Sequence, residues 1–139
     1  MSRSFEEKSV WIQLVCMLVS LGVYFVLAGR LLASGVREMP AFAALFMVSV
    51  VLMVCFMGVA YGLTALMSCV ETRDERDQVI AMRSEYRSSW LVAVGVFGAV
   101  VCMTMGVENV WTANLLLMSL ALSEILGYVL QLVDYRKGV

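Results

Sequence analysis

Histidine is absent from this 139-residue chain, and proline occurs only once. Without histidine the chain cannot form a bis-histidine haem site, most catalytic zinc sites or the usual general base. Charge is also scarce, because 15% of the residues are charged, whereas an average soluble domain has roughly a quarter. The formal net charge of -1 provides no basic surface for nucleic acid. These absences exclude an ordinary soluble domain and a nucleic-acid-binding protein.

Cysteine is present but carries no recognisable motif. The four cysteines lie inside or at the edge of apolar runs and show no CxxC spacing: Cys16, Cys55, Cys69 and Cys102. Buried thiols behave as small hydrophobic groups, so packing explains these positions better than metal binding or redox chemistry. We therefore expect no metal and no cofactor.

Long apolar runs fill almost the whole chain, of which 62% is hydrophobic. A helix needs about 20 apolar residues to cross the hydrocarbon core of a bilayer. The pattern predicts an all-α fold, a four-transmembrane-helix bundle that forms a single domain over residues 1–139. The first run is long enough to be retained as a helix and is not typical of a cleaved signal peptide. The expected spans cover about residues 10–32, 41–70, 89–107 and 111–133.

A polar segment, residues 71–88, separates the second span from the third, and its first 17 residues hold nine of the chain's 21 charges. Thr72 and Glu75 fit a helix-capping box. The residues around it supply an apolar face, Val79, Ile80 and Met82, and a basic face, Arg76, Arg83 and Arg87. We expect a short amphipathic interfacial helix between spans two and three that lies along the membrane surface. It is either a self-paired connector or a contact for a cytoplasmic partner or for anionic lipid. The candidate contact residues are Asp74, Glu75, Arg76, Asp77, Arg83 and Arg87.

The distribution of Arg and Lys predicts the orientation. The leader, the polar segment and the tail hold eight of these residues, and the two short turns hold only Arg30 and Arg37. Short loops rich in positive charge stay in the cytoplasm. We therefore expect a multi-pass protein of the plasma membrane (the inner membrane of the cell) with cytoplasmic N- and C-termini.

Two pairs of small residues predict close helix contacts within the membrane. Gly58 and Gly62 form a GxxxG pair in the second span, and Gly95 and Ala99 form a similar pair in the third. Small residues at this spacing let helix backbones approach closely. Such packing favours self-association or binding to another membrane protein, in addition to contact with membrane lipids.

Glu124 is the acidic residue that the sequence places well inside a span, about nine residues or 14 Å from the end of the fourth helix. A charge at that depth costs several kcal/mol, so we expect a neutral carboxyl group hydrogen-bonded across the bundle. Tyr24, Tyr61 and Thr64 are its candidate partners. Glu124 is either a contact that fixes helix packing or a proton or cation site. At helical spacing it shares a polar stripe with Asn114, Tyr128 and Gln131.

A family resemblance covers residues 74–139, through the run DERDQVIAMRSEYRSSWLVAVGV and the later run NLLLMSLALSEILGYVLQLVDYRKGV. These runs resemble an uncharacterised family of small prokaryotic membrane proteins with a DERD loop and a Y-R-R-G type tail; Lys137 stands where arginine is more usual. The resemblance implies four spans and a prokaryotic plasma membrane, and it implies no activity. It singles out Asp74, Glu75, Arg76, Asp77, Arg83, Glu124 and Arg136.

No feature of the sequence indicates an enzyme, because there is no nucleophile motif, no paired acid within a span and no intramembrane lysine. The favoured interpretation is a non-catalytic membrane protein with a structural, accessory or regulatory role, acting through self-association or a partner. The alternative is a small proton- or cation-coupled transporter or channel that uses Glu124 within an oligomer. A wet cavity at Glu124 favours transport, whereas a dry contact favours the structural role.

Overall fold

The structure is a computed structural model that describes residues 5–67 and 75–137, and this part of the chain is helical apart from two turns. The helices are α1 Phe5–Ala33, α2 Met39–Met67, α3 Glu75–Ser88, α4 Trp90–Thr104 and α5 Asn109–Lys137. Four helical stretches are long and apolar enough to cross a membrane, with α3 and α4 counted together. The predicted all-α fold with four membrane-length helices is confirmed.

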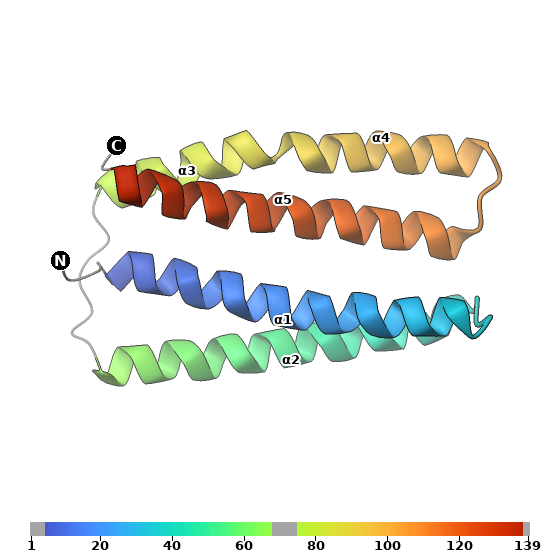
Figure 1. Ribbon diagram of the computed structural model, residues 1–139, viewed down its shortest axis with the longest axis horizontal. Coiled ribbons are helices and arrows are strands. Elements are labelled where there is room, and N and C mark those ends of the chain that lie inside the picture. Colours follow the sequence, from blue (N-terminus) through green and yellow to red (C-terminus); the bar gives the residue numbers. More distant parts are fainter. Residues whose placement is uncertain (1–4, 68–74, 138–139) are drawn as a thin grey trace.

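The helices form two antiparallel hairpins that lie side by side (Figure 1). One hairpin is α1 with α2, and the other is α3 and α4 with α5. The hairpins meet mainly along α1 and α5, so that the packing order across the molecule is α2, α1, α5 and then α3 with α4. Within the described residues no comparable contact joins α4 to α1 or α2. The bundle is therefore open on the side where a closed four-helix bundle would bring its outer helices together.

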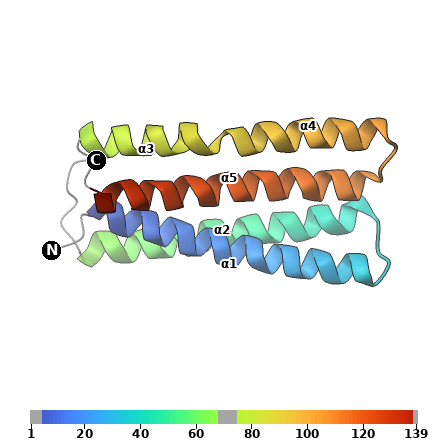
Figure 2. The ribbon, with the colours of Figure 1, turned by 45° about the horizontal axis from the view of Figure 1, so that its top comes forward.

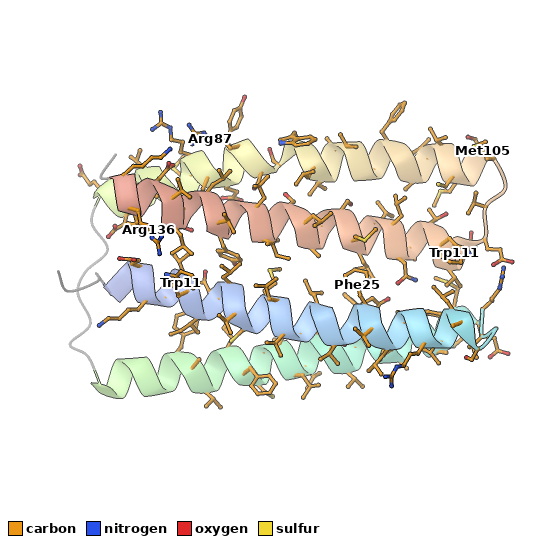
Figure 3. All side chains as sticks on the ribbon, viewed as in Figure 1. Trp11, Phe25, Arg87, Met105, Trp111 and Arg136 are labelled. Atoms are coloured by element: carbon orange, nitrogen blue, oxygen red, sulfur yellow. The ribbon has the colours of Figure 1, made fainter. Side chains whose placement is uncertain are left out.

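The two ends of the bundle differ in what they carry. The start of α1, the end of α2, the start of α3 and the end of α5 share one end, here called the terminal end (Figure 1). The other end, the turn end, carries the two hairpin turns, each closed by a glycine with a positive φ, Gly35 at 83° and Gly106 at 73°. Glycine adopts this conformation without the steric cost that a Cβ brings. Trp11 lies near the terminal end and Trp111 near the turn end, as expected for interface residues (Figure 3).

The third span differs in extent from the expected one. A helix of 15 residues such as α4 is about 22 Å long, which is too short for a hydrocarbon core of about 30 Å. The helix between spans two and three is present as α3, but it runs in line with α4 and packs along α5 (Figure 2). The membrane-length helix therefore begins at Asp77 and ends at Thr104. Trp90 lies near the middle of this helix, although a tryptophan next to an apolar run is typical of a membrane interface.

Packing and direct polar contacts join the helices in the turn-end half of the bundle. Tyr24, Ala28, Phe42 and Val110 form a buried cluster that joins α1, α2 and α5. The Tyr24 hydroxyl, from within this cluster, donates a hydrogen bond of 3.1 Å to the side-chain oxygen of Asn114. This polar contact joins α1 to α5. Beyond it, Arg37 donates to both carboxylate oxygens of Glu108 at 2.7 Å, which ties the two turns together.

The two small-residue pairs have different surroundings. Gly95 and Ala99 are buried against α5, and a methyl group added at Gly95 would overlap the side chain of Ser119. A methyl group at Gly58 or Gly62 would meet no atom within 4 Å. The third span therefore approaches α5 closely at its small residues, whereas α2 leaves its GxxxG pair uncovered within the described part of the chain.

We predict that Gly95→Ala lowers the free energy of unfolding by about 1–3 kcal/mol, because overfilling a tight contact forces backbone shifts. Gly58→Ala should be neutral or stabilising by up to about 1 kcal/mol, since alanine is the better helix former and has space there. Thermal unfolding in detergent, followed by circular dichroism, measures both. Equal losses in the two variants would contradict the α4–α5 contact at Gly95.

Candidate functional site

A polar groove occupies the terminal-end half of the structure, between the α1–α2 hairpin and helices α3, α4 and α5. Its volume is about 940 Å³. All five helices contribute to its lining, and most of the polar side chains that line it come from α3 and α5. The polar residues in the lining are Ser9, Gln13, Tyr61, Ser84, Glu85, Ser88, Ser89, Ser123, Glu124, Tyr128 and Gln131.

Glu124 lies near the middle of the 29-residue helix α5 and lines this groove. It is exposed in the structure, and no hydrogen bond or ion pair joins its side chain to another described residue. The expected hydrogen bond across the bundle is therefore absent from this part of the chain. Tyr24 bonds to Asn114 instead, Tyr61 shares the groove with Glu124, and the side chain of Thr64 lies outside the described residues.

Glu85 is a second carboxylate in the same groove. Glu85 belongs to the polar segment of residues 71–88, which the sequence predicts to lie outside the membrane because the third span is expected to begin at Ser89. Since α3 extends that span inward to Asp77, Glu85 lies within a membrane-length helix. The sequence does carry a signal for this position of Glu85. The third apolar run is too short to cross the bilayer by itself, so residues before Ser89 must belong to the same span.

Two tyrosines and two amides complete the polar lining. The Tyr61 hydroxyl accepts hydrogen bonds from Ser9, at 2.9 Å, and from Gln13, which fixes the phenol of α2 against α1. Tyr128 on α5 lies close enough to Glu124, Tyr61 and Glu85 to interact with them electrostatically. Tyr128 is therefore near both acidic residues of the groove, Glu124 on α5 and Glu85 on α3, and near Tyr61 on α2.

Gln131 is an unusual member of the lining. Only 7% of its surface is exposed, yet no hydrogen bond joins its amide to another described residue. A buried amide without a partner costs free energy, unless the space that it faces holds water or a ligand. Because Gln131 lines the groove, its amide is available to whatever fills that space.

The break between α3 and α4 builds one wall of the groove. At this break the Val92 N–H bonds to the Ser89 carbonyl at 3.1 Å, so the Ser88 carbonyl loses its usual helical partner. The Ser123 hydroxyl, from a residue that is 4% exposed, donates to that carbonyl at 2.9 Å. Gly127 allows the Ser88 side chain to lie directly against α5. The freed backbone group is thus satisfied by a side chain, as hydrocarbon requires.

The charged side chains that line the groove are all acidic. Its lining contains two carboxylates and no Lys or Arg. The nearest basic residue on α3, Arg87, forms an ion pair of 3.5 Å with Asp134, whose side chain is only 8% exposed. Figure 3 shows Arg87 on α3 beside the last turns of α5. The carboxylates of the groove are therefore left without a cation from the described residues.

The candidate residues from the sequence are only partly brought together. Glu124, Tyr128 and Gln131 share the groove, whereas Asn114 lies in the turn-end half. Of the candidate partner or lipid contacts, Asp77, Arg83 and Glu75 lie on α3 and Arg87 contacts α5. Asp74 and the side chain of Arg76 lie outside the described residues.

Comparison with protein-family models, with curated proteins and with solved structures finds no match to this chain. The resemblance to the uncharacterised prokaryotic family therefore stays a prediction.

We predict that Arg87→Ala lowers the free energy of unfolding by about 1–3 kcal/mol, because it leaves the buried Asp134 carboxylate without its cation. Arg83→Ala removes an exposed arginine of the same helix and should change stability by less than about 0.5 kcal/mol. The double variant Arg87→Ala/Asp134→Asn should recover most of the loss. Chemical unfolding in detergent distinguishes these outcomes, and an unrecovered double variant would contradict the ion pair as the cause.

Proposed function

We propose that this protein is a non-catalytic, multi-pass membrane protein that conducts or carries a proton or cation, with Glu124 as the acidic group of its binding site. The observation that carries the proposal is the position of Glu124 in a polar groove of about 940 Å³. A structural role for Glu124 requires a dry contact between helices, and Glu124 makes no such contact in the described residues. The alternative interpretation of the sequence is therefore the better supported one.

The chemistry of the groove supports this function. A carboxylate at membrane depth is costly in hydrocarbon and usually faces a bundle interior or a water-filled cavity. A charged group in such a cavity can exchange a proton or pair with a cation. Because the lining holds acids and no bases, the electrostatic field in the groove favours cations over anions.

The asymmetry of the bundle supports access from one end. The groove lies in the terminal-end half, whereas the cluster around Tyr24 and the Arg37–Glu108 pair join the two hairpins in the turn-end half. A carrier must bind its cargo from one side at a time, and a site displaced toward one end of the bundle fits one such state.

The open packing supports self-association. A single chain leaves α2 and α4 unconnected, and a lone four-helix unit is small for enclosing a pathway. A second copy, or another membrane protein, would shield the groove from lipid, and the uncovered Gly58 and Gly62 on α2 suit close helix contact. We propose a homo-oligomer as the active form.

The proposed setting is a prokaryotic plasma membrane with both termini in the cytoplasm. It rests on the family resemblance and on the excess of Arg and Lys at the terminal end. In this orientation the groove lies in the cytoplasmic half of the bundle, and the two turns face the outside.

We predict that Glu124→Gln abolishes a protonated-carboxyl infrared band that changes with pH and with added cation in the wild-type protein. The same variant should reduce cation or proton flux into proteoliposomes by at least about tenfold, because the loss of one charge–charge interaction removes roughly 1.4 kcal/mol or more. Infrared difference spectroscopy and a pH-sensitive dye inside the vesicles measure the two effects.

Glu38→Gln is the matched control, since it removes one exposed carboxylate at the turn end that lies outside the groove and outside the Arg37–Glu108 pair. It should leave both the infrared band and the flux as in the wild type. A wild-type carboxyl group that responds to neither pH nor cations would reject the transport function and return the structural role to first place.

We predict that a cysteine at Glu38, in a variant without native cysteines, reacts with an impermeant maleimide added to intact spheroplasts. A cysteine at Gln78 on α3 should react only after the membrane is permeabilised, because the positive-rich end stays in the cytoplasm. The reverse labelling pattern would overturn the proposed orientation.

A further inference from the structure

We propose that Glu85 and Glu124 together bind a small organic cation that carries an amine or quaternary ammonium group, an inference that rests on the proposed function and names its cargo. Glu85 comes from α3 and Glu124 from α5, so the third and fourth spans each supply one carboxylate to the same groove.

The size of the groove argues for an organic ligand. Pockets of about 300–1,000 Å³ typically hold organic molecules of drug size, and this groove of about 940 Å³ lies at the upper end of that range. A bare metal ion instead needs several ligands drawn tightly around it. Among the described residues no group of three or more His, Cys, Asp or Glu side chains could hold a metal ion.

The charge of the groove argues for a cation. Neither Glu85 nor Glu124 has an ion pair or side-chain hydrogen bond within the described residues, and the lining contains no basic side chain. The one arginine close by in sequence, Arg87, is paired with Asp134. Two unpaired carboxylates that line the same groove attract a cation more strongly than either does alone.

The uncharged lining residues suit an ammonium group on an organic body. Tyr61 and Tyr128 line the groove, and the aromatic rings of tyrosine attract cations. Gln131, which is 7% exposed, has no hydrogen-bond partner among the described residues and lines the groove, so its amide oxygen can accept a hydrogen bond from an N–H group. This buried and unpartnered amide points to a ligand independently of the acids.

The test uses the full chain in nanodiscs of neutral phosphatidylcholine, titrated calorimetrically with benzylammonium and with benzyltrimethylammonium. Benzyl alcohol is the uncharged comparison, and empty nanodiscs correct for partition into lipid. We expect saturable binding of both cations and none of the alcohol. Glu85→Gln and Glu124→Gln should each weaken binding at least about tenfold, the double variant should bind neither cation, and Glu38→Gln at the turn end should bind as the wild type does.

Gln131→Leu gives a second readout that a general loss of structure would not produce. It should weaken the binding of benzylammonium and spare benzyltrimethylammonium, because only the former has N–H groups to donate. Each variant is accepted only if its thermal unfolding matches that of the wild type.

The outcomes separate this inference from the proposed function. Binding that depends on Glu124 and not on Glu85 would overturn the two-carboxylate site and leave transport through Glu124 intact. The absence of saturable binding, together with Glu124-dependent flux of protons or inorganic cations, would overturn the organic cargo alone. The absence of both binding and flux would overturn the inference and the proposed function together.

Discussion

The structure depends on the mismatch between the length of α4 and the thickness of a bilayer. Fifteen helical residues reach about 22 Å, so α3 must supply the remaining turns of the third span. As part of that span, α3 runs parallel to the span axis and packs against α5. Ser84, Glu85 and Ser88 on α3 therefore line the groove. The polar groove follows from this packing of α3, because a helix lying flat on the membrane surface would leave α5 with one intramembrane acid and no facing wall.

The two halves of the bundle differ in how their polar side chains are accommodated. In the turn-end half the polar contacts are direct pairs, as in the bond between Tyr24 and Asn114 and the pair of Arg37 with Glu108; the buried Thr112 hydroxyl is an exception, without a partner among the described residues. In the terminal-end half several polar groups face shared space, among them Glu85, Glu124 and Gln131. Hydrocarbon penalises unpaired polar groups, so the second arrangement is sustained only by water or a ligand in the groove.

Hydrophobic runs predicted most of the fold, because the hydrocarbon core imposes a length that a sequence displays directly. The number of spans, the two tight turns and the position of Glu124 within α5 followed from that length. The sequence could not show that α3 stands upright, because its buried face, Ile80, Ser84 and Ser88, carries only one large apolar side chain and is obscured by many charges. For the same reason Glu85 was missed. The separation of Asn114 from Glu124 was also hidden, since residues on one helix stripe meet different neighbours at different depths.

The hairpins touch mainly along one line, the seam of α1 against α5, while Tyr61 on α2 and Glu85 on α3 lie on the flanking helices. This arrangement suits a hinge-like rotation of one hairpin about the other. A small rotation of one hairpin about the seam barely disturbs the contacts of α1 with α5, yet it displaces the flanking helices by an amount that grows with their distance from the axis. The width of the groove is therefore the most easily adjusted dimension of the molecule, and a few degrees of rocking would change it with little loss of packing.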